Sequence, residues 1–198
     1  MIVDERIITF INSLDTKNSE ILEDIEREAL ADNVPIIRRE MQSFLKVLLM
    51  VKKPMRVLEV GTAVGFSALL MSEYVPEECA ITTIENYEKR IPIARQNFVR
   101  AGKEKKITLL EGDAMDVLKT LEGPYDFIFM DAAKGQYIHY LPEILRLLAK
   151  GGILVSDNVM QDGDVIESRF AVERRDRTIH ARMREYLYEL KHNDALVT

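Results

Sequence analysis

The chain has 198 residues, of which 47% are hydrophobic and 30% are charged, and its formal net charge is −6. This composition predicts one globular domain, residues 1–198, and excludes a broadly basic nucleic-acid-binding coat and an apolar run of the roughly 18 residues that span a membrane. The single cysteine, Cys79, excludes an intrachain disulfide framework. Together with an N-terminus that lacks a signal-peptide pattern, these features predict a cytoplasmic protein without a membrane partner.

The first 53 residues are predicted to form a helical extension. Apolar residues recur at helical spacing over 2–14, 18–32 and about 38–51. Pro35 and Pro54 interrupt the pattern and are expected to separate the third helix from its neighbours.

From residue 54 to residue 198, short apolar runs alternate with amphipathic segments. The predicted strands span 55–60, 80–84, 106–110, 125–130 and 152–156. The predicted helices span 65–74, 87–101, 113–121, 135–149 and about 164–191. This alternation predicts an α/β fold: a Rossmann-like, doubly wound, mostly parallel sheet with helices on both faces, preceded by the N-terminal helical extension.

The turn after the first predicted strand, VLEVGTAVGFS at 57–67, is the main candidate for a ligand-binding loop. Its glycines, Gly61 and Gly65, allow the backbone to approach a ligand closely. Glu59 stands where a phosphate-binding loop would carry glycine, and its charge would repel a phosphate. Glu85, which ends the second strand, is placed to accept hydrogen bonds from ribose hydroxyls. The two acids therefore predict a nucleoside with a positively charged amino-acid tail, such as S-adenosylmethionine.

Polar side chains mark the ends of all five predicted strands. They are Glu59, Glu85, Asp113, Asp131 and the pair Asp157-Asn158. Each alone is explained equally well as the N-cap of the next helix. Because the carboxyl ends of parallel strands share one edge, five in register favour a common site. Two carboxylates and an amide oxygen, from Asp131, Asp157 and Asn158, are hard ligands suited to Mg²⁺ or another divalent cation such as Mn²⁺, although Asp-Asn also forms ordinary turns.

Five segments together resemble a known family. They read LEVGTAVGFSALL, IENYEKRIPIARQNF, GDAMDVL, YDFIFMDAAKGQYIHYL and GGILVSDNV, within residues 30–175. They resemble the class I, divalent-cation-dependent O-methyltransferases, the group of the catechol and caffeoyl-CoA enzymes. The resemblance implies Mg²⁺-dependent methyl transfer from S-adenosylmethionine to a hydroxyl group that neighbours a second oxygen.

The resemblance also implies roles for individual residues. Lys134 matches the general base and Asp131 is the second catalytic residue, although a lone lysine at a helix start usually lies on the surface. The metal ligands implied are Asp131, Asp157 and Asn158. The residues that match cofactor positions are Ile37, Glu59, Gly61, Thr62, Ser67, Glu85, Asp113, Ala114 and Asp131.

Arginines are concentrated between residues 167 and 185 of this otherwise acidic chain. The candidate contacts with the substrate are Arg169, Arg174, Arg175 and Arg177. On charge alone, a phosphate-binding surface and a solvated helix face are equally good interpretations. The resemblance favours the first, because the short N-terminal helices and DAAKGQY look most like the bacterial branch that methylates 5-hydroxyuridine at the tRNA wobble position to 5-methoxyuridine. The arginines would then hold the RNA backbone while the base enters the site.

Other interpretations stay open. A small catechol-like metabolite would present the same pair of oxygens without needing the arginines. A non-catalytic cofactor-binding protein would share the fold, but would be expected to lose some of the polar site residues. A nicotinamide-dependent dehydrogenase is disfavoured by Glu59 and by the missing Gly-x-Gly motif.

The resemblance carries two further expectations. Family members are commonly homodimers, and the apolar faces of the helices at 2–14 and 18–32 are the candidate contact. The family's sheet normally ends in an antiparallel hairpin, which we expect to be missing because the sequence stops where the next strand would begin.

Overall fold

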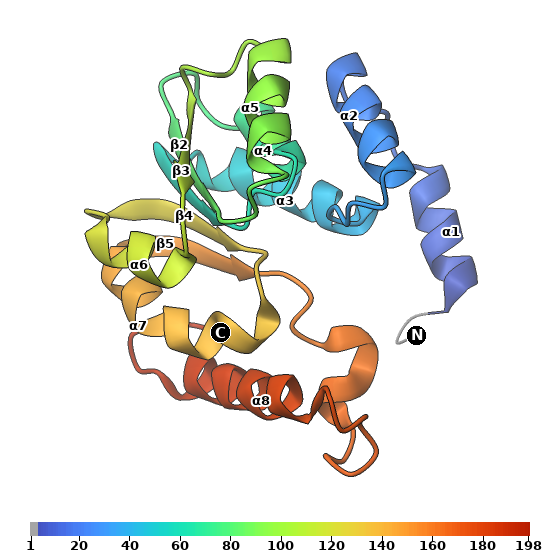
Figure 1. Ribbon diagram of the computed structural model, residues 1–198, viewed down its shortest axis with the longest axis vertical. Helices are drawn as coiled ribbons and strands as arrows, with labels where there is room; N and C mark the ends of the chain where they lie inside the picture. The colour runs from blue at the N-terminus through green and yellow to red at the C-terminus, as the bar shows by residue number, and fades with distance from the viewer. Residues whose placement is uncertain (1–3) are drawn as a thin grey trace.

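The structure is a computed structural model and describes residues 4–198. Its first part consists of three helices, α1 (Glu5–Ser13), α2 (Glu20–Ala31) and α3 (Arg39–Lys52), as the sequence predicts (Figure 1). Residues 2 and 3 of the first predicted helix lie outside the described residues. The side chain of Asp4 accepts a hydrogen bond from the backbone N–H of Arg6 and so caps the start of α1.

Five strands form one sheet in which every pair is parallel, which confirms the predicted fold class. They are β1 (Arg56–Val60), β2 (Ala80–Glu85), β3 (Ile107–Glu111), β4 (Tyr125–Met130) and β5 (Leu148–Ser156). Their order is β3-β2-β1-β4-β5, so the direction of winding reverses between β1 and β4. In such a sheet, ligands bind outside the carboxyl ends of the strands at this reversal.

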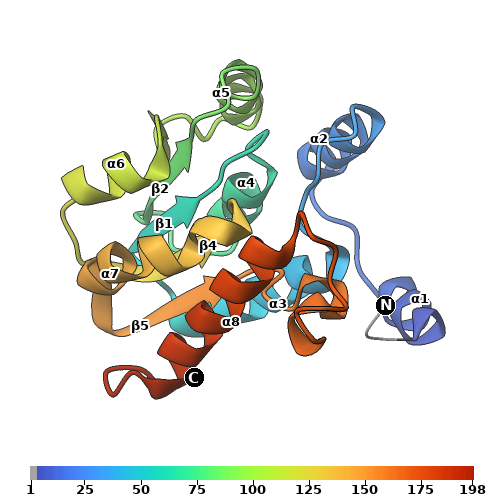
Figure 2. The ribbon, with the colours of Figure 1, turned by 60° about the horizontal axis from the view of Figure 1, so that its bottom comes forward.

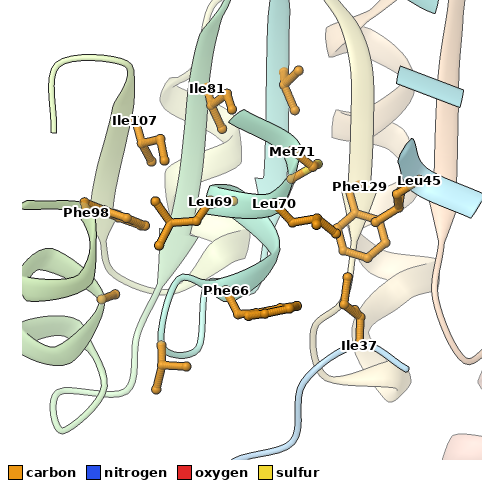
Figure 3. Packing of buried hydrophobic residues seen from close by; sticks show 14 of the residues in the cluster. Ile37, Leu45, Phe66, Leu69, Leu70, Met71, Ile81, Phe98, Ile107 and Phe129 are labelled. Carbon is orange, nitrogen blue, oxygen red and sulfur yellow. The ribbon is translucent and has the colours of Figure 1, made fainter. Parts of the chain in front are cut away.

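Helices cover both faces of the sheet, and each face has its own apolar core (Figures 1 and 2). On one face, α2, α3, α4 (Phe66–Glu73) and α5 (Ile91–Arg100) pack around β-strand residues such as Val57, Ile81 and Phe129. Figure 3 shows Ile81 and Phe129 in this core. On the other face, α6 (Ala114–Thr120), α7 (Tyr137–Leu147) and α8 (Arg177–His192) pack against Leu58 and Met130. Neighbouring strand residues thus point to opposite faces, as the period of a strand requires.

Two predicted helices are shortened or divided in the structure, and a third, predicted over 87–101, begins only at Ile91 as α5. The predicted helix 164–191 is replaced by a 3₁₀ segment, η2 (Gln161–Ile166), an irregular stretch over 167–176, and α8. The stretch buries only Val172, whereas α8 buries a helical stripe of His180, Met183, Tyr186 and Leu190, so a helix forms only where an apolar face has something to pack against.

The second change concerns the predicted helix 135–149. It is a 3₁₀ turn, η1 (Lys134–Gln136), followed by α7, and β5 begins at Leu148 rather than at residue 152.

None of the helices among residues 4–198 is both long and apolar enough to cross a bilayer.

Gly61 directly follows the last residue of β1 and has no room for a side chain. Its φ is +103°, and an added Cβ would overlap the main-chain carbonyl oxygen of Asp131. We therefore expect Gly61→Ala to lower the free energy of unfolding by about 3 kcal/mol or more, since backbone strain alone costs about 1–3 kcal/mol. Gly102→Ala is the matched control, because Gly102 has φ +63° with open space around it. Urea unfolding measures both variants, and equal losses would contradict the predicted clash.

Candidate active site at the carboxyl edge of the sheet

One cavity lies at the predicted edge, where the carboxyl ends of β1 and β4 meet. Its volume is about 1410 Å³, larger than the roughly 300–1,000 Å³ typical of a pocket for one small ligand. The cavity therefore has room for a nucleoside and a second molecule together. The predicted site residues that line it are Ile37, Gly61, Thr62, Ser67, Glu85, Ala114, Asp131, Lys134, Asp157 and Asn158.

The carboxylate of Glu85 is fixed at the cavity wall by backbone donors. Its Oε2 accepts a hydrogen bond from the N–H of Ala63 at 2.7 Å, and its Oε1 accepts from Asn86 and Tyr87 at 3.0 and 2.8 Å. These contacts connect the glycine loop after β1 to the end of β2. A carboxylate held in this way is oriented before any ligand arrives, which suits the predicted contact with ribose.

Glu59 lies behind the cavity wall rather than on it. Its side chain is 0% exposed and accepts hydrogen bonds from Ser67 Oγ and Thr83 Oγ1, both at 2.5 Å. Thr83 in turn lies 2.5 Å from the hydroxyl of Thr62. The direct cofactor contact predicted for Glu59 is therefore corrected: Glu59 orients Ser67 and, through Thr83, Thr62. Thr83 is absent from the predicted site residues, although it pairs with Glu59 in the sheet register.

Burial raises the pKa of Glu59 from 4.5 to about 7, and the nearby charges of Asp131 and Glu85 add to this, against the hydrogen bonds from Ser67 and Thr83. The folded protein keeps this proton up to about pH 7, whereas the unfolded chain loses it above about pH 4.5. Between these values the unfolded state binds fewer protons, so Glu59 stabilises the fold less as pH rises.

The variant Glu59→Gln should lack this pH dependence. We expect the difference in unfolding free energy, wild type minus variant, to fall by about 3 kcal/mol between pH 4 and pH 8, at about 1.36 kcal/mol per pKa unit. Urea unfolding across this pH range measures the difference, with Glu104→Gln as the control at an exposed site. If the unfolding free energies of wild type and Glu59→Gln changed with pH in parallel, the prediction would be contradicted.

Asp113 does not line the cavity, in contrast to its neighbour Ala114. Its Oδ1 accepts a hydrogen bond from the backbone N–H of Met115 at 2.8 Å, so the side chain caps α6. The side chain thus has a capping role in this structure, and its contact with the cofactor stays a prediction. Because Ala114 lines the cavity, the start of α6 still forms part of the cavity wall on the side predicted to bind the nucleoside.

Asp131 and Asp157 lie side by side at the ends of adjacent strands. Met130 pairs with Ser156 in the register of β4 and β5, and each aspartate directly follows the last residue of its strand. The N–H of Asp157 donates to the carbonyl of Met130 at 2.9 Å. Burial, together with the charge of Asp131, raises the pKa of Asp157. A bound cation would relieve this repulsion between two carboxylates.

Asn158 completes the donor set that the sequence predicts. It lines the same cavity, with φ +52°, a conformation that asparagine adopts more readily than most residues. Among residues 4–198, no group of three His, Cys, Asp or Glu side chains is placed to hold a metal, so a site here depends on the amide. Two carboxylates and an amide oxygen are compatible in chemistry with Mg²⁺ or Mn²⁺.

Lys134 projects into this acidic end of the cavity. Its Nζ lies 2.7 Å from Asp131 Oδ1 and 3.0 Å from Tyr137 Oη. Tyr137 is fully buried, its hydroxyl donates to the carbonyl of Met130 at 2.8 Å, and burial raises the pKa of its phenol. Tyr137 thus fixes the loop that carries Lys134. It is a further site residue that the sequence interpretation missed, although it lies in the quoted DAAKGQY segment.

The arginines are not gathered at the cavity. None of Arg169, Arg174, Arg175 and Arg177 lines it. Arg175 forms ion pairs with Glu173 at 3.0 Å and Asp176 at 3.4 Å, and Arg177 donates to the carbonyl of Val172. For these two, the solvated-face interpretation fits better than a phosphate-binding one.

The opposite wall of the cavity is apolar and comes from the N-terminal helices. It is formed by Ile8 and Ile11 of α1 and by Met41 and Phe44 of α3. This wall was not predicted, since α1 was interpreted as part of the extension and as a dimer contact, and α3 only as part of the extension. Their amphipathic pattern carried no indication of which cavity they would cover.

A sequence profile of the O-methyltransferase family matches residues 12–194. The chain belongs to the O-methyltransferase family. It is 35% identical over 128 residues to a catechol O-methyltransferase of Niastella koreensis, covering 63% of this chain and 58% of that protein. It is 36% identical over 112 residues to a catechol O-methyltransferase of Mycobacterium tuberculosis, covering 56% and 51%. The chain thus spans little more than half the length of these relatives.

Solved structures of O-methyltransferases have the same fold. A putative caffeoyl-CoA O-methyltransferase of Staphylococcus aureus superposes with a TM-score of 0.86 at 28% identity, covering 96% of this chain and 90% of that one. The SAH-bound methyltransferase PaMTH1 of Podospora anserina gives the same TM-score at 27% identity, with 96% and 86% covered. Membership of the O-methyltransferase family is therefore confirmed, whereas its cation dependence and the tRNA-modifying branch stay predictions.

Proposed function

We propose that this protein transfers the methyl group of S-adenosylmethionine to a small aromatic acceptor with two neighbouring oxygens, aided by Mg²⁺ or a similar divalent cation. One observation carries the proposal: a single cavity joins the fixed carboxylate of Glu85 to the Asp131, Asp157 and Asn158 donor set, with Lys134 beside it. Family membership and the catechol O-methyltransferases among the relatives support it.

The nucleoside end of the cavity would bind the cofactor. Glu85 would accept hydrogen bonds from the ribose, and the glycine loop at Gly61 would let the backbone approach the amino-acid tail. Ser67 and Thr62, oriented by Glu59 and Thr83, would present hydroxyls to the same tail. When bound, S-adenosylmethionine supplies an electrophilic methyl group on sulfur.

The acidic end would bind the acceptor. Asp131, Asp157 and Asn158 would hold the divalent cation, which when bound supplies Lewis acidity that makes a neighbouring hydroxyl more acidic. Lys134, as the neutral amine after its ammonium has released a proton to solvent, would accept the hydroxyl proton at Nζ, in a position set by Asp131 and Tyr137. The apolar wall of α1 and α3 would cover the ring and exclude water, so that the acceptor oxygen is held in line with the methyl group.

A second candidate acceptor is 5-hydroxyuridine at the tRNA wobble position. One observation favours it: Arg169 and Arg174 are exposed in the stretch that follows η2, and Asp162 of η2 lines the cavity. The apolar wall and the ion pairs of Arg175 favour the small acceptor instead.

Association into a homodimer through α1 is part of the proposal. Three large apolar side chains of this region that do not line the cavity, Ile7, Phe10 and Leu14, are 52–68% exposed, and α1 itself buries no residue. Such a stripe on a surface helix is typical of a contact with another chain. Sedimentation analysis of the wild type and of a Phe10→Ser variant tests this contact.

The acceptor is tested by incubating the protein with methyl-labelled S-adenosylmethionine, Mg²⁺ and a panel of acceptors. The panel contains catechol, resorcinol, whose hydroxyls are not adjacent, and tRNA that carries 5-hydroxyuridine. We expect label in catechol and none in resorcinol. Label in the tRNA alone would replace the first candidate by the second, and label in resorcinol as fast as in catechol would contradict the requirement for neighbouring oxygens.

A further inference from the structure

The mouth of the acceptor end is bridged by an ion pair between residues that are distant in sequence. Arg38, just before α3, places its Nη2 3.0 Å from Oδ1 of Asp162 in η2, and both residues line the cavity. Their side chains are 69% and 65% exposed. An exposed pair of this kind contributes only about 0–1 kcal/mol, so a ligand can replace either partner at little cost.

Most N–H donors of the Arg38 guanidinium make no hydrogen bond in this ion pair. Within residues 4–198 it donates a single hydrogen bond, to Asp162, although guanidinium has five N–H donors in a fork that matches a carboxylate. The other charged side chains of this end are engaged: Lys134 pairs with Asp131, and Glu40 accepts a hydrogen bond from Asn12 at 2.9 Å. Arg38 is therefore the cation at this end that is available to a ligand.

The charge balance of the cavity favours an anion at this position. The charged residues of the wall are Arg38, Arg90, Lys134, Glu40, Glu85, Asp131, Asp157 and Asp162. A bound dication would offset the charges of Asp131 and Asp157, which leaves Asp162 as the carboxylate that pairs with Arg38.

We propose that Arg38 selects acceptors that carry a carboxylate, by exchanging Asp162 for a two-point contact with that carboxylate. The acceptor would be an aromatic vicinal diol with an acidic substituent, its ring against the apolar wall of α1 and α3. Asp162 holds Arg38 when the acceptor is absent and releases it when the acceptor binds. This proposal rests on the proposed function, because it concerns the acceptor of the same reaction.

The test compares catechol, 3,4-dihydroxybenzoate, 3-(3,4-dihydroxyphenyl)propanoate and 2-(3,4-dihydroxyphenyl)ethylamine in wild type and variants. In Arg38→Met, we expect the KM to rise about tenfold or more, with kcat unchanged, for whichever of the two acids has the lower KM in the wild type. The reason is that the contact with the carboxylate is lost equally from the ground state and the transition state. The KM for catechol should stay within about twofold. Arg38→Lys should recover part of the loss, because lysine keeps the charge but lacks the fork.

Asp162→Asn should act in the opposite direction. It removes the competing carboxylate and keeps the shape, so the KM for the acid should fall about two- to fivefold. Arg95→Met is the matched control. Arg95 does not line the cavity, and it forms an exposed ion pair with Glu111 in which the nitrogen and oxygen lie 2.6 Å apart. This control should leave every acceptor unchanged.

Calorimetric binding of the acids in the presence of SAH and Mg²⁺ separates this proposal from the proposed function. Acid binding that is weakened by Arg38→Met supports the role of Arg38, even if no acceptor is methylated and the proposed function fails. Equal effects of Arg38→Met on catechol and on the acids, or a wild-type preference for the amine, would overturn it.

Discussion

Asp157→Ala is expected to lower kcat for catechol methylation by about three orders of magnitude at saturating Mg²⁺, since the metal contributes several kcal/mol to such a reaction. Asp157 supplies one of two carboxylates in the candidate donor set, next to Asp131 at the ends of β4 and β5. The alanine also removes a carboxylate whose pKa is raised by burial, so the fold should lose little stability. Initial rates over a range of Mg²⁺ concentrations measure the effect.

The control for this variant is Asp164→Ala, which removes an exposed carboxylate of η2 that does not line the cavity. SAH binding by calorimetry should be unchanged in both variants, because Asp157 lies at the acceptor end. A wild-type rate in Asp157→Ala would remove the metal assignment. Loss of SAH binding together with activity would instead place Asp157 in the cofactor site.

Lys134→Met should reduce kcat by about 10²–10⁴-fold, the usual contribution of a general base. Methionine keeps the length of the side chain and removes the nitrogen that lies 2.7 Å from Asp131 and 3.0 Å from Tyr137. The KM for S-adenosylmethionine should stay close to that of wild type, because the cofactor end is built from other residues. Single-turnover kinetics measure the methyl-transfer step itself.

Lys119→Met is the matched control for the general base, since Lys119 lies on α6 in an exposed ion pair with Asp116. It should retain the wild-type rate. Tyr137→Phe gives a graded test: the loop should keep its place through packing, and kcat should fall less than in Lys134→Met. A Lys134→Met variant with the wild-type single-turnover rate would show that the acceptor hydroxyl loses its proton without this lysine.

The sequence predicts the sheet and most of the site because both follow from local patterns. Five apolar runs, each followed by a helix, define parallel strands, and polar residues after those strands must then share one edge. Asp131, Asp157 and Asn158 follow this rule directly. Their common cavity is therefore expected from chain order alone, without any knowledge of side-chain packing.

Glu59 was placed wrongly because it was treated as a residue of the strand end. It is the fourth residue of β1, on the same face as Val57, and Val57 belongs to the core under α4. The period of the strand therefore turns Glu59 inward, toward Ser67 of α4 and Thr83 of β2. The alternation was available in the sequence, but the partner residues depend on the sheet register.

The long helix predicted over 164–191 fails for a different reason. Charged residues at 173–177 are compatible with a helix, and only tertiary contact decides that helical packing begins near His180. The same limit applies to the apolar wall of the cavity. Ile11 and Phe44 have the spacing of amphipathic helices, but sequence spacing does not say that α1 and α3 face the strand ends.

The central claim is metal-assisted methyl transfer at the edge of β4 and β5, and one measurement tests it most directly. The protein is dialysed against EDTA and mixed with methyl-labelled S-adenosylmethionine and catechol, and labelled guaiacol is quantified before and after Mg²⁺ or Mn²⁺ is added. The account predicts almost no product without a divalent cation and full activity after its addition, with no such recovery in Asp157→Ala. Product formed at the full rate in the EDTA-treated protein would contradict it.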